Sequence, residues 1–297
     1  MKYVLFIIIY TILWSISILP FSVLYFLSDI FYFLLYKIVG YRVKTVRANL
    51  KLTFPELNDA ERKEIEQKFY RHLCDLFLEM IKTITVSSKE LNKRFVFDNP
   101  ELIKAYEQKE KSIILMLPHY ANWEWIIGLG NHLDYKGFGI YKKLKNKYFD
   151  KLFRDIRSRF NAELISTQQT TGVIRENQTK GLYGVYLFLS DQTPLLRDNL
   201  HWEKFMGVEV PVHLGAEVLA RKLNMNMLYL HIEKVKRGHY KATFSEITDD
   251  IKKEPKYKPT RLFLDKMEAQ IRKAPEFYFW THKRWKYKGL KEQFKTK

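Results

Sequence analysis

Continuous apolar runs alternate with helical stripes of apolar positions along most of this chain. The runs predict buried strands at 112–117, 182–189 and 225–232, with shorter strands at 137–141 and 240–247. Apolar positions at helical spacing predict helices at 59–84, 122–132, 146–160, 213–223 and 259–272. Strands that alternate with helices indicate an α/β domain, built on a mixed sheet flanked by helices.

The first 40 residues follow a different pattern. Between positions 3 and 36 only Asp29 carries a charge, and Pro20 divides the apolar run. A spanning helix needs about 20 apolar residues, so we expect a membrane-inserted helix at 3–19 and a second apolar helix at 21–39. The second helix would lie along the membrane or re-enter it. The run is too long for a signal peptide and lacks a cleavage pattern.

The balance of charge narrows the class of partner. Lys and Arg number 51 against 33 Asp and Glu, a formal net charge of +18, which favours anionic partners. A basic cluster follows the apolar run, so we expect that flank to stay cytoplasmic and to meet anionic headgroups at the inner membrane. Because basic residues are spread along the chain behind an apolar segment, we expect no nucleic-acid partner.

The organisation is expected to be simple. Cys74 is the one cysteine, so the chain can form no internal disulfide and no thiolate metal cluster. No internal repeat, low-complexity tract or linker is visible after residue 50. We therefore expect a membrane anchor at 1–40 and one catalytic domain at 41–297.

The segment PHYANWEW, residues 118–125, follows the first buried strand and places His119 five residues before Glu124. A neutral imidazole can take a proton from a hydroxyl that attacks an acyl carbonyl, and a carboxylate on its other nitrogen fixes the tautomer. Two residues five positions apart do not lie on the same face of a helix, so the pair requires His119 to lie in the loop before the helix, where Pro118 places it. The alternative is a solvated loop histidine and a first-turn glutamate. The spacing is not a zinc motif of the His-Glu-x-x-His type.

This segment resembles the His-x4-Asp/Glu motif of the lysophospholipid acyltransferase superfamily, and most closely its branch of late lipid A biosynthesis acyltransferases. Further blocks resemble that branch in the same order, at 41–56, 141–160, 190–194, 205–221 and 275–286. Two departures stand out. Lys142 replaces a usual Arg, which keeps the charge but loses the planar fork, and His213 stands where small residues are frequent. The Phe-Pro-Glu-Gly-Thr-Arg type of block of glycerolipid enzymes is absent, which argues against a glycerol-phosphate acceptor.

The resemblance implies a glycerolipid-acyltransferase-like fold and transfer of a fatty acyl chain to a hydroxyl of a phosphorylated lipid A precursor. The donor would be an acyl carrier protein or coenzyme A thioester, and no metal or cofactor is needed. His119 would act as general base with Glu124 orienting it, at the cytoplasmic face of the inner membrane. Substrate would be bound by Asn122, Lys142, Arg157, Asp191 and Gln192. The alternatives are another glycolipid or amino-acid lipid acceptor, and a non-catalytic basic protein that binds a membrane surface.

Overall fold

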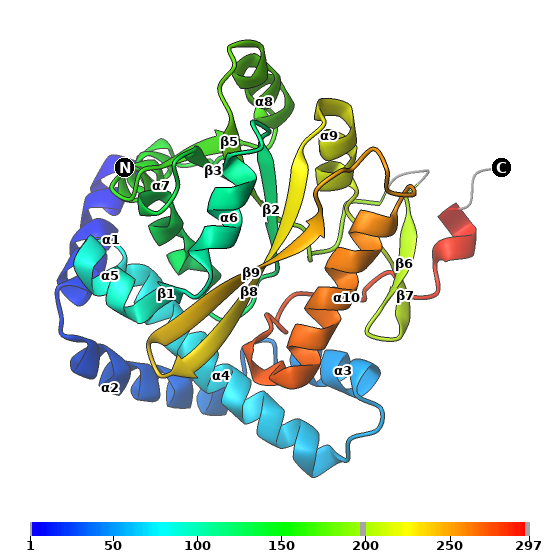
Figure 1. Ribbon diagram of the computed structural model, residues 1–297. Coiled ribbons are helices and arrows are strands. Elements are labelled where there is room, and N and C mark those ends of the chain that lie inside the picture. Colours follow the sequence, from blue (N-terminus) through cyan, green and yellow to red (C-terminus); the bar gives the residue numbers. More distant parts are fainter. Residues whose placement is uncertain (1, 197–199, 295–297) are drawn as a thin grey trace.

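A seven-stranded mixed sheet forms the centre of the computed structural model, which describes residues 2–196 and 200–294 (Figure 1). The strand order is β1-β9-β8-β2-β5-β3-β4, and all neighbours are parallel except β8 and β9. The mixed α/β architecture predicted from the sequence is thereby confirmed. The strands are β1 (Phe95–Phe97), β2 (Ile113–Leu117), β3 (Lys136–Tyr141), β4 (Ala162–Ser166), β5 (Gly184–Leu189), β8 (Asn226–Lys236) and β9 (His239–Thr248).

Helices cover both faces of this sheet, as expected for strands that are apolar on both sides. Every residue of β2 is buried, and β2 lies between β5 and β8 in the middle of the sheet. A separate two-stranded ribbon, β6 (Trp202–Phe205) with β7 (Val208–Pro211), lies beside the C-terminal segment. The helices of the body are α3 (Val43–Thr53), α4 (Asp59–Lys82), α5 (Ser88–Arg94), α6 (Pro100–Glu107), α7 (Lys147–Ser158), α8 (Thr170–Thr179), α9 (Gly215–Leu223) and α10 (Lys258–Lys273).

The long helix α4 connects the N-terminal part of the chain to the sheet. Its N-cap is Asn58, the residue before the first acidic residue, Asp59. Glu61 completes a capping box with Asn58. One face of α4 is buried, and this face carries the polar residues His72, Asp75 and Glu79 as well as apolar ones. A buried carboxylate needs partners, and those of Asp75 and Glu79 come from the N-terminal helices, from β8–β9 with the turn between them and, for Glu79, also from Asn122 in the loop after β2.

The expected helix at 122–132 is instead a 3-10 helix, η2, from Trp123 to Asn131. It contains two glycines, Gly128 and Gly130, which lower helix propensity. Gly130 lies so close to the neighbouring backbone that a Cβ there would stand 2.3 Å from the carbonyl oxygen of Phe160. The tight winding and the absence of a side chain at 130 keep this segment pressed against the start of β4.

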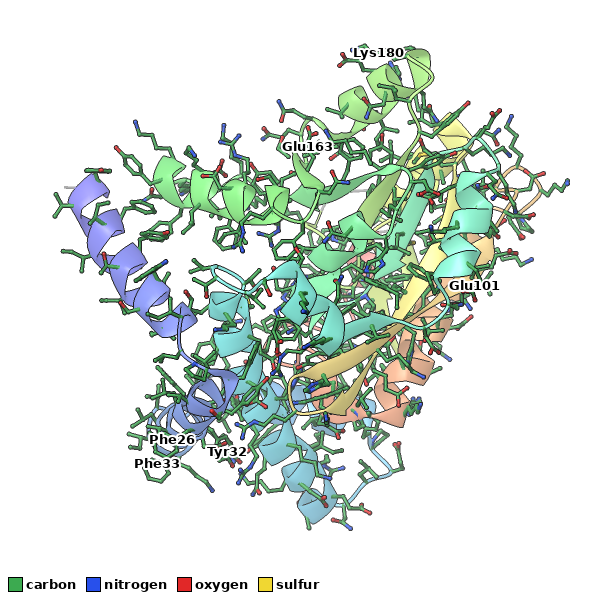
Figure 2. All side chains as sticks on the ribbon, turned by 60° about the vertical axis from the view of Figure 1, so that its left-hand side comes forward. Phe26, Tyr32, Phe33, Glu101, Glu163 and Lys180 are labelled. Atoms are coloured by element: carbon green, nitrogen blue, oxygen red, sulfur yellow. The ribbon has the colours of Figure 1, made fainter. Side chains whose placement is uncertain are left out.

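The N-terminal helices pack on the body and expose a continuous apolar face (Figure 2). Helix α1 (Lys2–Ser17) ends before Pro20, and α2 (Phe21–Tyr32) continues into a π-helix, η1 (Phe33–Ile38). By length and composition the stretch Phe21–Ile38 could cross a membrane. One side of it bonds to α4, where the hydroxyls of Tyr25, Ser28 and Tyr36 donate to Glu79, Asp75 and Glu66. The opposite side presents large apolar residues to the outside, with Phe26 66% and Phe33 56% exposed.

Candidate active site

The pairing of two parallel strands brings His119 to Asp191. In the sheet register Leu117 of β2 lies opposite Leu189 of β5, so the loops that follow leave the sheet side by side. The Nδ1 atom of His119 lies 2.7 Å from Oδ1 of Asp191, which is 1% exposed. The expected placement of His119 in the loop between strand and helix is confirmed.

Burial and charge oppose each other in this pair. Burial lowers the pKa of His119, but the charge of Asp191 and its hydrogen bond outweigh burial, so the pKa lies above its usual value. Burial likewise raises the pKa of Asp191, but His119 shifts it further in the other direction, to below its usual value. With Nδ1–H donated to Asp191, the lone pair of Nε2 is directed away from the carboxylate. The amide nitrogen of Gln192 stands 3.4 Å from Nε2.

His119 lines a cavity of about 1080 Å³ that lies against β3, β5, η2 and α9. Of the residues expected to bind substrate, Lys142, Arg157 and Gln192 line it, as does Glu124. Its wall has an apolar part, formed by Ile126, Leu129, Leu133 and Leu164 together with four glycines, and a basic part with Lys142, Arg157 and Lys222. Such a lining suits a ligand that combines a hydrocarbon chain with an anionic group.

Glu124 contacts a different partner from the one the spacing suggested. Its Oε2 accepts a hydrogen bond of 2.6 Å from Nη2 of Arg157 on α7, and both side chains are about one-fifth exposed. The carboxylate on His119 is Asp191, a residue that the sequence reading placed with the substrate-binding group. The negative charge of Glu124 still contributes to raising the pKa of His119. Two ion pairs, His119–Asp191 and Glu124–Arg157, therefore lie at the same cavity.

Asn122 lies in the core, behind the wall of the cavity. It is fully buried, its Oδ1 accepts from the backbone N–H of Trp125, and its Nδ2 donates to Oε2 of Glu79 at 2.7 Å. The hydroxyls of Tyr25 and Tyr240 also donate to Glu79, each at 2.8 Å. Glu79 thus ties the motif loop to both α2 and β9. The sequence gives one sign of this role. Glu79 is a glutamate on the apolar stripe of residues 59–84, and it shares that stripe with Asp75 and His72.

Glu79 should make the stability of the protein depend on pH. Burial raises the pKa of Glu79 from 4.5 to about 7 against its hydrogen-bond donors and the nearby Lys234, so within that window the folded chain retains a proton that the unfolded chain releases. Stability then decreases as pH rises through the window. We expect wild type to gain up to about 3 kcal/mol over Glu79→Gln on going from about pH 8 to about pH 5. Thermal unfolding of the two proteins at both pH values measures this, with the exposed Glu64→Gln as control; a constant difference would contradict it.

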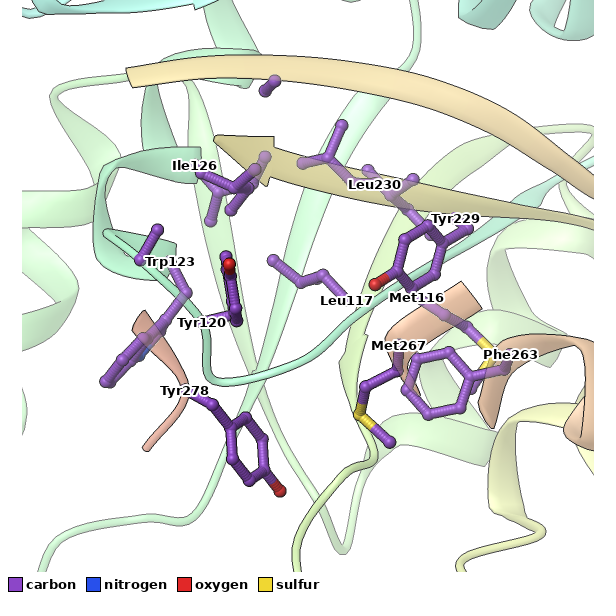
Figure 3. Close-up of a cluster of buried hydrophobic side chains, with 14 of the residues drawn as sticks. Met116, Leu117, Tyr120, Trp123, Ile126, Tyr229, Leu230, Phe263, Met267 and Tyr278 are labelled. Atoms are coloured by element: carbon purple, nitrogen blue, oxygen red, sulfur yellow. The ribbon is translucent and has the colours of Figure 1, made fainter. Parts of the chain in front are cut away.

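The C-terminal segment 277–284 joins the loops that carry His119 and Asp191. Tyr278 forms a β-bridge with Tyr120, and the backbone N–H of Phe279 donates to the carbonyl of His119 at 3.2 Å. Figure 3 shows Tyr120 and Tyr278 with Trp123 at the end of β2. On the other loop, the N–H of Thr193 donates to Nε2 of His282 at 3.1 Å. The position of His119 relative to Asp191 therefore depends on residues far along the chain.

Two further observations concern the tryptophans and the histidine of the block 275–286. Trp280 and Trp285 are buried, at 0% and 3% exposure, so they belong to the core. Burial lowers the pKa of His282 to about 4, so its ring is neutral and can accept from Thr193. Among residues 2–196 and 200–294, no group of three or more His, Cys, Asp or Glu side chains is arranged to hold a metal ion.

Comparison with known proteins identifies the family of this chain. The family described as bacterial lipid A biosynthesis acyltransferase matches residues 1–287. A lipid A biosynthesis palmitoleoyltransferase of Escherichia coli is 22% identical over 287 residues, 95% of this chain and 90% of that protein. The E. coli lauroyltransferase of lipid A biosynthesis is 24% identical over 93% of this chain and 89% of its own length. A lipid A biosynthesis acyltransferase of Haemophilus influenzae is 27% identical over 50% of this chain, and the match spans about half (48%) of that relative.

Proposed function

Because the chain belongs to the bacterial lipid A biosynthesis acyltransferase family, as the order of its sequence blocks predicted, we propose that it transfers a fatty acyl chain from a thioester to a hydroxyl of a lipid A precursor. The observation that carries this proposal is His119, paired with buried Asp191, at a cavity whose lining is partly apolar and partly basic. The catalytic domain is of the glycerolipid-acyltransferase type, and residues 1–40 are its membrane anchor.

In this mechanism Nε2 of His119 takes the proton of the acceptor hydroxyl as the oxygen attacks the thioester carbon. Asp191 holds the other ring proton and stabilises the imidazolium that forms. The tetrahedral intermediate then expels the thiolate, which takes the proton from Nε2 and leaves as a free thiol. The products are an ester on the acceptor and the thiol of the donor, and His119 returns to its neutral state.

Glu124 and Arg157 supply the charge that this reaction needs around it. Arg157 lies at the cavity with its guanidinium fixed by Glu124, so it can face an anionic group of the acceptor or the developing oxyanion. Glu124 adds negative charge near His119 and so favours the imidazolium. In this account the His-x4-Glu motif acts as two linked pairs, with Glu124 assisting His119 through space while Asp191 contacts it directly.

Arg157→Lys should reduce kcat/KM because lysine keeps the charge but loses the planar fork that pairs with Glu124 and with a phosphate. We expect a loss of about tenfold, and a larger loss for Arg157→Ala. Initial rates with a tetra-acylated lipid A precursor at two salt concentrations provide the measurement. Arg154→Lys on the exposed side of α7 is the matched control. Equal rates for wild type and both Arg157 variants would remove this residue from the site.

The apolar outer face of α2 and η1 supports membrane association. On this face Phe26 and Phe33 are exposed while the other side of the helix is bonded to α4, an arrangement typical of a helix that lies in the plane of a membrane surface. The catalytic cavity would then face the cytoplasm at the inner membrane, where thioester donors are made. The net charge of +18 suits an acidic carrier protein and a phosphorylated lipid.

Replacing Phe26 and Phe33 together by glutamate should weaken binding to anionic phospholipid vesicles by at least tenfold, since each buried phenylalanine contributes about 1.5–3 kcal/mol. Folding should persist because neither side chain bonds to α4. Vesicle cosedimentation measures the effect. The control is Leu182→Glu, because Leu182 is exposed in the loop that precedes β5. Undiminished binding of the double variant would assign the membrane surface to another part of the chain.

Incubation of the purified full-length protein with each donor tests the proposed reaction. Acyl carrier protein and coenzyme A thioesters are supplied separately with a tetra-acylated lipid A precursor, and mass spectrometry measures the mass of the product. We expect one additional acyl chain on the precursor with at least one donor. Transfer only to a different glycolipid or to an amino-acid lipid would replace the acceptor in this proposal, and no transfer to any of them would favour a binding protein.

A further inference from the structure

A second cavity lies on the far side of the Glu124–Arg157 pair. It has a volume of about 190 Å³, and its wall is formed by apolar side chains of α1, α4 and α7, such as Leu13, Met80 and Leu152. Glu124 and Arg157 supply its charged groups. This cavity is a groove that is partly open to the outside, since Phe77 in its wall is 44% exposed. Apolar side chains that line an open groove of this size are typical of a site that an apolar ligand covers.

The two cavities meet at one place. Glu124, Ile127 and Arg157 line both of them, so the ion pair stands between the catalytic cavity and the apolar one. An amphiphile could therefore place a polar group at Arg157 in the large cavity and a hydrocarbon chain in the small one. The charged pair at Arg157 suits a phosphorylated or sugar headgroup. The apolar walls beyond it offer no hydrogen-bond partner, so only a hydrocarbon chain suits them.

The position of the second cavity connects it to the apolar N-terminal helices. Its outer wall includes α1, whose Phe6 stacks on Tyr148 and meets Phe149 of α7 at ring distances of 5.4 and 5.1 Å. Figure 2 shows α1 reaching across to α7 away from the sheet. Phe77, which also lines this cavity, is 44% exposed. Helix α1 itself exposes apolar side chains, among them Ile8 and Ile12, so a chain that leaves the cavity at α1 can continue into the bilayer.

We propose that this second cavity binds an acyl chain that the acceptor glycolipid already carries. The inference rests on the proposed function. The donor chain begins at the thioester carbon next to Nε2 of His119, and the apolar part of the large cavity starts there, beside Trp123 and Ile126. A resident chain of the acceptor begins instead at the sugar, beyond Arg157, and has its other end in the bilayer. The cavity between α1, α4 and α7 matches that second path.

Crosslinking tests this assignment without requiring turnover. Full-length His119→Ala protein in detergent is irradiated with a lipid A precursor that carries a diazirine near the sugar end of one acyl chain, the part that the proposal places in the second cavity. We expect crosslinks in peptides covering 77–84 and 149–157, strongly reduced in a second protein that also carries Leu152→Trp. Leu182→Trp, outside both cavities, should keep them. A diazirine-bearing acyl thioester should crosslink 129–133 and 164 instead, because these residues line only the large cavity.

Each outcome decides between the possible occupants. Crosslinks of the glycolipid at 129–133 alone, or of the thioester at 77–84, would show that the second cavity does not hold a chain of the acceptor and would overturn the proposal. Crosslinks of the glycolipid at 77–84 and 149–157 support it even if the wild-type protein transfers no acyl chain, in which case only the proposed reaction fails. In the active enzyme, Leu152→Trp should raise KM for the glycolipid at least tenfold and leave KM for the thioester within twofold.

Discussion

Replacing His119 by alanine should abolish acyl transfer, with kcat reduced by between about a hundredfold and ten-thousandfold. The reason is that Nε2 of this ring, held by Asp191, provides the base at the cavity in which the acceptor hydroxyl would lie. The measurement is the initial rate of product formation, detected by mass spectrometry, with a thioester donor and a lipid A precursor. Vesicle binding should change little, because His119 lies in the loop after β2 and not on the exposed apolar face of α2 and η1. Thermal unfolding shows whether the variant still folds, since the substitution leaves the buried Asp191 without its partner.

The matched control is His239→Ala, a histidine at the start of β9, where its ring contacts only the backbone oxygen of Arg237 among the bonds that the structure gives. This variant should retain the wild-type rate. If His119→Ala keeps more than about one-tenth of wild-type turnover, the general-base role is wrong and another group at the cavity must accept the proton.

Asp191→Asn should cost nearly as much, about a hundredfold to ten-thousandfold in kcat, although the side chain keeps its size. An amide can donate to Nδ1 and so hold the wrong tautomer of His119, and it cannot stabilise the imidazolium. The binding of the acceptor should change little, since Asp191 is buried behind His119 and does not line the cavity. Steady-state kinetics separate the two effects, with kcat falling and KM for the precursor staying within a few-fold.

Glu124→Gln is the comparison for this variant. It removes the partner of Arg157 and part of the charge near His119, but leaves the hydrogen bond of His119 to Asp191. We expect a smaller loss in kcat than for Asp191→Asn, with a rise in KM for the acceptor. A larger loss in kcat for Glu124→Gln than for Asp191→Asn would give Glu124 the orienting role that the sequence spacing first suggested.

Much of the site was visible in the sequence because it depends on local signals. The apolar run of β2 and Pro118 after it place His119 at the end of a strand, and the run of β5 places Asp191 in the same kind of position. What the sequence did not reveal is that β2 and β5 are neighbours. That pairing joins residues 72 positions apart, and nothing in one sequence records it.

Other differences have equally specific causes. The segment after the motif is a 3-10 helix because Gly130 packs against the backbone at Phe160, a contact that helical periodicity does not encode. From the sequence Asn122 is expected at the substrate, as part of the motif between His119 and Glu124. Its side chain instead donates a hydrogen bond to the buried Glu79 and lies in the core. The C-terminal block contacts the loops of His119 and Asp191 partly through backbone hydrogen bonds, which residue types do not encode, and partly through the side chain of His282, which accepts from Thr193.

The pH dependence of kcat/KM tests most directly the claim that His119, held by Asp191, is the general base. As pH falls through the pKa of His119, Nε2 becomes protonated and cannot accept, so the rate declines on the acid side. Since Asp191 raises that pKa, we predict that the acid limb of the wild-type profile lies above the usual pH range of a histidine and moves to lower pH in Asp191→Asn. An acid limb that stays in place in Asp191→Asn but moves in Glu124→Gln would contradict the account.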